Sequence, residues 1–301
     1  MTNNKTIKGV IFVALGATSY GMLATFVKLA YQENYTTAEV TTSQFVLGLI
    51  GLIIINLFQK INSKTVAQKP TQKNIFQLML AGTSLGMTSV FYYLCVKYID
   101  VSIAIVLLMQ TVWMGVLLEM ILDKKLPSKQ KVIAVVLVLF GTILATNLLN
   151  NQNTIDWRGI FWGMLAAMSF TTTMFTANRI ATHISSAQRS LYMLLGGAII
   201  VFGFGIATQT TKFNFEIFFK WGLIISLFGT IIPPMLFNVG FPSTGIGLGS
   251  IVASLELPVS VMMAYFILNE TVVLSQWLGI LLILFAIIIM NINFKNNKIL
   301  S

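Results

Sequence analysis

The stretch Ile246–Glu270, IGLGSIVASLELPVSVMMAYFILNE, is long and apolar enough to cross a bilayer as one helix. Its apolar run is interrupted near the midpoint by a carboxylate, Glu256, and then by Pro258. An acid at this depth costs about 2.5–3.5 kcal/mol on insertion scales, and a proline weakens the hydrogen-bond ladder of its helix. On a helical wheel the acid shares a stripe with the small residues Gly249, Ala253, Ser260 and Ala264. We therefore expect Glu256 to face packed protein or a cavity, not lipid.

The composition excludes an ordinary soluble domain. Of the 301 residues, 56% are hydrophobic and 9% are charged, whereas about a quarter of a soluble domain is charged. The net charge of +10 comes from Lys and Arg in short loops. The positive-inside rule for membrane proteins explains them, so no nucleic-acid partner is expected. The single cysteine, Cys95, rules out an intrachain disulfide and a cysteine metal cluster. We expect an integral membrane protein embedded in the lipid bilayer.

Ten apolar segments can be drawn, and no loop between them is long enough for a folded aqueous domain. They are Lys8–Ala30, Ala38–Phe58, Asn74–Tyr98, Val101–Leu122, Lys131–Leu149, Arg158–Ala181, Arg189–Thr208, Phe215–Val239, Ile246–Leu268 and Thr271–Asn293. Several are separated by only a few residues, so consecutive helices must be antiparallel. The pattern predicts an all-α polytopic membrane protein with ten transmembrane helices.

The positive charges indicate the orientation of the chain. If the first residue lies inside, alternate loops place 14 of the 19 Lys and Arg residues on the inner side. These are Lys5, Lys8, Lys60, Lys64, Lys69, Lys73, Lys124, Lys125, Lys129, Lys131, Arg179, Arg189, Lys295 and Lys298. Basic loops stay in the cytoplasm, so both termini are expected to be cytoplasmic, in the cell membrane. Glu119 lies one turn from this basic loop and is expected to pair with Lys124 or Lys125.

An internal repeat divides the chain into halves of five helices, residues 1–150 and 151–301. A shift of 150 places KGVIFVALGATSY from Lys8 over RGIFWGMLAAMSF from Arg158, and a shift of 146 aligns the later segments of the two halves. Because five is odd, the second half must enter the membrane from the opposite side. Such inverted repeats are the basis of many secondary transporters.

At this point the chain resembles a known family. The pattern ELPVSVMMAYFILNE followed by SQWLGILLILF at Glu256–Phe285, with a weaker copy at Ile121–Gly141, is similar to the drug/metabolite transporter superfamily, EamA type. Its most recognisable residues are Pro258, Glu270, Gln276 and Gly279. The resemblance covers essentially the whole chain. It implies ten helices, a central cavity between the halves, and transport of a small organic solute that it does not identify. The first half departs from the pattern, with Val112 where the second has Pro258.

Glu256 is the first candidate for a functional residue. It could hold a proton for coupling or bind a substrate ammonium, or it could be a protonated carboxyl that hydrogen-bonds a neighbouring helix. With the shift of 146 its counterpart is Gln110, which is neutral, and Lys124 stands where the second half has Glu270. The asymmetry indicates one ionisable site, not two.

Other candidates lie on polar faces of the predicted helices. Trp113, one turn beyond Gln110, either stacks on a ring or cation in the cavity or fills space against lipid. Tyr92 is a candidate for the cavity wall, and Thr18 lies on a narrow polar face that ends at Lys28. Lys28 either extends its ammonium to the membrane surface or contacts a substrate carboxylate.

Two further patterns concern helix geometry. Pro233 and Pro234, followed by Asn238, indicate a hinge or a broken-helix binding element, with an ordinary kink as the alternative. Gly82 and Gly86 form a GxxxG pair, which is typical of close helix packing.

The sequence lacks the motifs of the common enzyme classes. It contains one histidine and no CxxC, HExxH, Walker or GxSxG motif, so no enzymatic activity, metal or cofactor is expected.

We expect a secondary transporter that moves a small organic metabolite, such as an amino acid, out of the cell by alternating access. Facilitated diffusion and proton exchange through Glu256 both remain open, as does the choice between a monomer and a weak dimer. The expected substrate-binding residues are Glu256, Gln110, Trp113, Tyr92, Thr18 and Asn238. The alternatives are an uptake carrier of the same fold and a non-transporting scaffold or receptor.

Overall fold

The computed structural model of the chain describes residues 2–62, 70–99, 101–147 and 156–291. All regular elements in these ranges are helices. Six residues named above lie outside the described residues: Lys64, Lys69, Leu149, Asn293, Lys295 and Lys298.

The first half contains α1 to α6, and the second half contains the remaining elements. The first six are α1 (Thr2–Gln32), α2 (Thr37–Asn62), α3 (Gln72–Tyr98), α4 (Val101–Leu108), α5 (Thr111–Asp123) and α6 (Lys129–Ala145). The others are α7 (Trp157–Arg179), α8 (Ser186–Thr208), η2 (Phe218–Gly222), α9 (Leu223–Ser226), η3 (Leu227–Ile231), α10 (Ile232–Thr244), α11 (Ile246–Ala253), α12 (Glu256–Leu268) and α13 (Leu274–Asn291).

The predicted all-α membrane architecture is confirmed. Within the described residues, eight helical spans are long and apolar enough to cross a membrane, and the apolar part of α13 is shorter. The segments α4 and α5 form one such span, as do α11 with α12, and η2 through α10. With α6, these elements account for the ten predicted segments.

Local sequence sets the helix ends. Four N-cap side chains accept hydrogen bonds from backbone N–H groups in the first turn of α3, α6, α7 and α8, which would otherwise lack partners. These residues are Thr71, Ser128, Asp156 and Ser185. At the C-terminal ends of α5 and α12, Lys124 and Asn269 adopt left-handed conformations with φ of 51° and 53°, which stops each helix.

The fourth and ninth spans are each interrupted once. The interruption of the fourth span was not predicted from the sequence. The breaks lie at Met109–Gln110 and at Ser254–Leu255. Together with the matching end residues Lys124 and Asn269, they relate these helices by a shift of 145. The predicted shift of 146 is therefore wrong by one residue here, and Gln110 matches Leu255, not Glu256.

The adjacent prolines of the eighth span begin a new helical segment. Pro233 and Pro234 occupy the first turn of α10, where a missing N–H removes no helical hydrogen bond. The π-helical segment η3 immediately precedes them, and such segments are common at functional positions. The span continues to Thr244, beyond the predicted end at Val239.

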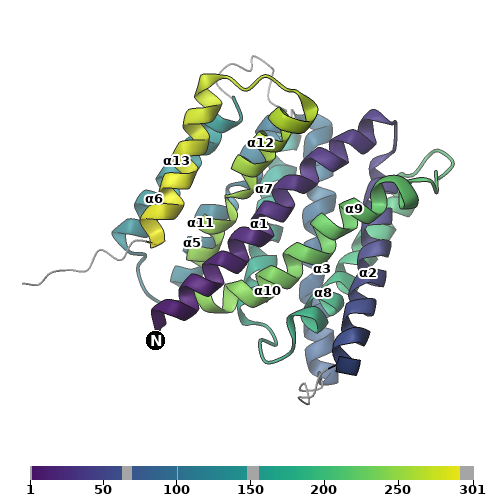
Figure 1. The fold of residues 1–301 in the computed structure, drawn as a ribbon, viewed down its shortest axis with the longest axis horizontal. Coiled ribbons are helices and arrows are strands. Elements are labelled where there is room, and N and C mark those ends of the chain that lie inside the picture. The colour runs from purple at the N-terminus through teal and green to yellow at the C-terminus, as the bar shows by residue number, and fades with distance from the viewer. Residues whose placement is uncertain (1, 63–69, 100, 148–155, 292–301) are drawn as a thin grey trace, which may run out of the picture.

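The helices pair as an inverted repeat requires. In Figure 1, α1 crosses the view obliquely from the N-terminus at the lower left, and α6 and α13 lie side by side at the left edge. Helix α1 of the first half packs on α10 of the second, and its equivalent α7 of the second half packs on α3 of the first. Equivalent spans also pack on each other: α2 packs on α8, α6 packs on α13, and the fourth span packs on the ninth through α5 and α11.

Arg189 of α8 joins three helices at one end of the bundle. Its side chain is 1% exposed and has no carboxylate partner among the described residues. It donates to the backbone oxygens of Thr176 at 3.0 Å, Ala177 at 2.7 Å and Ile180 at 3.0 Å, at the end of α7. A fourth bond, of 2.7 Å, reaches the backbone oxygen of Asn238 in α10. The guanidinium thus satisfies helix-end carbonyls and matches the negative end of the α7 dipole.

Gly82 confirms the close packing predicted from the GxxxG pair. A Cβ atom there would lie 2.6 Å from the carbonyl carbon of Met193 in α8. We expect Gly82→Leu to separate α3 from α8 and to lower stability by about 1–3 kcal/mol, measured as thermal unfolding of the purified protein in detergent. Gly203→Leu, on α8 with no atom within 4 Å of its Cβ position, is the control. Equal effects of the two substitutions would contradict the role of Gly82.

Candidate substrate site

Glu256 is the first residue of α12, directly after the break in the ninth span. It lies near the middle of the span Ile246–Leu268. The residue is partly exposed, and its carboxyl has no hydrogen bond or ion pair with any residue that the structure describes. The alternative that Glu256 is a protonated carboxyl hydrogen-bonded to a neighbouring helix is therefore not supported by any contact of the described residues.

Helix α1 lies against the start of α12. A Cβ atom on Gly21 would be 2.7 Å from Cβ of Val259, and would also contact the backbone oxygen of Glu256. The neighbouring Tyr20 phenol lies close enough to the Glu256 carboxyl for electrostatic interaction. The sequence analysis did not select Tyr20, although it is the one tyrosine in the first predicted segment.

Two phenylalanines from the second half hold the Tyr20 ring. Its centroid is 6.1 Å from that of Phe170 in α7, edge to face, and 5.7 Å from that of Phe237 in α10. These contacts fix the position of the Tyr20 ring, because aromatic pairs at such distances are attractive. Three helices from both halves thus determine where the phenol lies.

Tyr92 of α3 approaches the same carboxyl. Its phenol lies within electrostatic range of Glu256, and its ring centroid is 6.3 Å from that of Tyr93. Tyr92 also packs against a buried cluster that contains Cys95, Ile99, Ile103 and Ala104. The structure therefore brings together two of the predicted residues, Glu256 and Tyr92, and adds Tyr20. With elements from α1, α3 and α12 around it, the carboxyl faces the interior of the bundle.

Gln110 and Trp113 form a pair of their own at the break between α4 and α5. The Trp113 indole Nε1 donates to Gln110 Oε1 at 2.9 Å, and Gln110 Nε2 donates to the backbone oxygen of Val106 at 2.9 Å. Both side chains are partly exposed. The Gln110 amide thus stabilises the break, and no hydrogen bond joins either residue to Glu256.

Thr18 and Asn238 lie in different surroundings. Thr18 is partly exposed and shares a face of α1 with Gly21, so it is near the Glu256 site. Asn238 is 4% exposed, and its amide donates to Ser190 Oγ at 2.9 Å. Its backbone oxygen accepts from Arg189, so the polar contacts of Asn238 are with α8 and not with Glu256.

The EamA-like transporter family matches residues 7–147 and again residues 157–292. The chain belongs to the EamA-like transporter family. The double match confirms the resemblance drawn from Glu256–Phe285 and identifies a multi-pass membrane protein from a family of transporters. No protein among the curated sequences matches.

The fold of this EamA-like protein is also similar to a solved structure. That structure is titled "Crystal structure of protein" and has a TM-score of 0.75 and 13% sequence identity. The similarity covers 95% of this chain and 97% of the other. At this identity the similarity concerns the fold alone.

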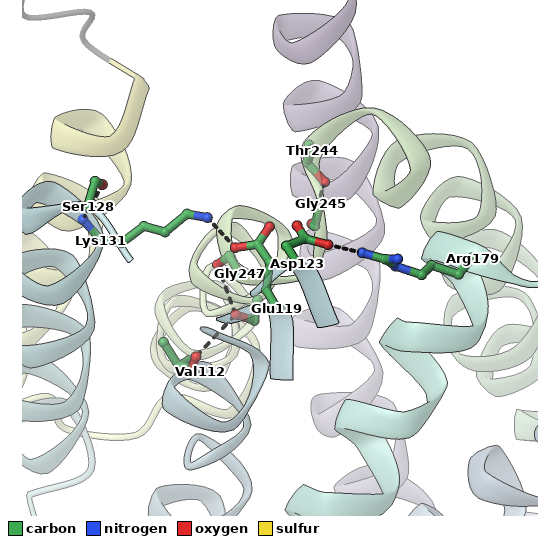
Figure 2. A network of polar contacts seen from close by, with 10 residues as sticks. Val112, Glu119, Asp123, Ser128, Lys131, Arg179, Thr244, Gly245 and Gly247 are labelled. Carbon is green, nitrogen blue, oxygen red and sulfur yellow. Dashed lines mark hydrogen bonds and ion pairs between the residues drawn. The ribbon is translucent and has the colours of Figure 1, made fainter. Parts of the chain in front are cut away.

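Charged pairs lie at the ends of the EamA-like bundle. Figure 2 shows Glu119 and Asp123 of α5 between two cations: Lys131 pairs with Glu119, and Arg179 pairs with Asp123. The predicted partners of Glu119, Lys124 and Lys125, are wrong. The left-handed turn at Lys124 ends α5, whereas Lys131 in the first turn of α6 points back toward Glu119.

Lys28 is also paired. Its ammonium binds the Glu270 carboxylate, which follows the end of α12. The suggested contact of Lys28 with a substrate carboxylate would therefore have to compete with Glu270.

Proposed function

We propose that this EamA-like protein is a secondary transporter that exports a small organic metabolite, an amino acid or a similar amine, across the cytoplasmic membrane by alternating access. The observation that carries the proposal is the Glu256 carboxyl, which lies in mid-span without a protein partner. An unpaired acid inside a membrane protein requires a proton or a bound cation. A substrate ammonium or a coupling proton meets that requirement.

The neighbouring rings favour an organic amine over a bare metal ion as the substrate. Tyr20 and Tyr92, whose phenols lie within electrostatic range of Glu256, offer oxygens and aromatic faces, and aromatic faces attract ammonium groups. Thr18, on the face of α1 that carries Gly21, adds a hydroxyl. Gln110 and Trp113, at the equivalent break of the first half, are proposed as a neutral part of the substrate path. No cofactor is required for this mechanism, and the end of the bundle that holds the start of α1 is proposed to face the cytoplasm.

Reconstitution into liposomes tests the proposal. Purified protein is incorporated, a pH gradient is imposed, and the flux of a panel of radiolabelled amino acids and amines is measured. We expect at least one compound to move against its concentration gradient, or down it at a rate above that of protein-free liposomes. Folded protein that moves no compound would contradict the proposal and favour a scaffold or receptor. Reversing the gradient in oriented vesicles distinguishes export from uptake.

A further inference from the structure

Three ion pairs among the described residues join the first half of the protein to the second, and two of them have similar places in the two halves. Lys28 near the end of α1 binds Glu270, which follows α12. Asp123 at the end of α5 binds Arg179 at the end of α7, as Figure 2 shows. In each case one partner comes from residues 7–147 and the other from residues 157–292, the two ranges that match the family separately.

The two pairs occupy similar places in the inverted repeat, although the paired acids differ by two positions in its register. Helices α1 and α7 are the first helices of the two halves, and each supplies its cation from near its C-terminal end. Asp123 directly precedes the left-handed residue Lys124, and Glu270 directly follows its equivalent Asn269. The first helix of each half is therefore tied to the end of the fourth helix of the other half.

The pairs lie at opposite ends of the bundle. A Cβ atom on Gly9 of α1 would be 2.8 Å from Ser243 Cβ in α10. The same end holds Gly245, which contacts Glu119 on the α5 turn next to Asp123. From Gly9 to Lys28 the helix rises about 28 Å, close to the thickness of the hydrocarbon core. The Glu256 site lies between the two pairs.

We propose that Lys28–Glu270 and Asp123–Arg179 are two latches, which close the central site at opposite faces of the membrane and open in turn. This inference rests on the proposed function, because latches serve a site with alternating access. Both pairs are formed in the structure, as a state closed at both ends requires. The four side chains are 42% to 52% exposed, and exposed ion pairs are weak enough to break repeatedly.

The remaining ion pairs do not share this arrangement. Glu119–Lys131 and Asp156–Arg158 each lie within one half. Glu33–Lys220, at 3.1 Å, joins the halves near the end of α1. Among the described residues, no ion pair at the opposite end of the bundle corresponds to it.

Labelling of a cysteine beside the site tests the proposal. In a Cys95→Ala background, Thr18→Cys introduces a thiol, and a membrane-impermeant maleimide is applied to one face at a time in sealed, oriented vesicles. Lys28→Gln should raise labelling from the Lys28 face about two- to five-fold and lower it from the other face. Asp123→Asn should do the reverse. The double charge exchange of Lys28→Glu with Glu270→Lys should restore the original rates.

Arg158→Gln is the matched control, because it removes an exposed cation paired within one half, at 53% side-chain exposure. If Lys28→Gln expresses poorly, Glu270→Gln breaks the same pair. Unchanged labelling, or shifts in the same direction for both pairs, would overturn the proposal. The readout needs no known solute. If no solute moves but the two substitutions shift labelling in opposite directions, the proposed transport function is wrong and the latches stand. If a solute moves but labelling is unchanged, the latches are wrong and the transport function stands.

Discussion

Arg189→Met is expected to lower the stability of the folded protein by about 3–5 kcal/mol. The substitution removes a side chain that is 1% exposed and takes the guanidinium donors from backbone oxygens at the end of α7 and in α10, of which only that of Thr176 is known to keep another donor, the Ile180 N–H. Each buried acceptor that loses its partner costs about 1–3 kcal/mol, and methionine fills much of the volume without replacing any bond. The measurement is the thermal midpoint, or the denaturant midpoint, of purified protein in a mild detergent.

Two variants make this result specific. Arg189→Lys keeps the charge but reaches fewer carbonyls, so its loss should be intermediate. Arg158→Met removes an exposed cation from the start of α7 and should change stability by about 1 kcal/mol or less. A midpoint for Arg189→Met that matches that of Arg158→Met would show that the buried bonds contribute little.

Glu256→Gln is expected to abolish pH-driven accumulation of the transported solute, to the level of protein-free liposomes. Glutamine has nearly the same shape and cannot exchange a proton or neutralise an ammonium. Because the Glu256 carboxyl makes no hydrogen bond with the described residues, the variant should fold with unchanged thermal stability. The measurement is uphill flux in proteoliposomes with an imposed pH gradient.

Downhill exchange separates the two possible roles of Glu256. If the residue only carries the proton, downhill flux persists in the variant, whereas a substrate-binding role predicts a loss of about ten-fold or more in apparent affinity. Glu216→Gln, the same change at an exposed position, is the control and should transport normally. Uphill flux that is unchanged in Glu256→Gln would remove Glu256 from the mechanism.

Most of the membrane architecture was predictable from sequence, because hydrocarbon requires long apolar helices with internal hydrogen bonds. The repeat was also visible, but its register near Gln110 was not. The break at Met109–Gln110 depends on a local pair between Gln110 and Trp113, and a shift of one residue hardly changes how well two apolar helices match.

The site was predictable only in part. Glu256 and Tyr92 stand out as polar groups in apolar segments, whereas Tyr20 becomes relevant because Phe170 and Phe237, from other helices, hold its ring. Arg189 was grouped with the loop cations because an arginine near a helix start is usually solvated. Its acceptors are backbone oxygens that α7 and α10 bring together in space, and backbone oxygens leave no pattern in a sequence.

The contact at Gly21 has a consequence for how the protein can move. Gly21 allows α1 to touch the backbone of α12 at the level of Glu256, while the nearest ion pair between these helices lies further along, at Lys28 and Glu270. Two rods that separate at one end and stay in contact elsewhere rotate about the contact, where displacement is smallest. Glu256 sits at that pivot, so a solute bound there would keep its depth while the walls on either side swing past it.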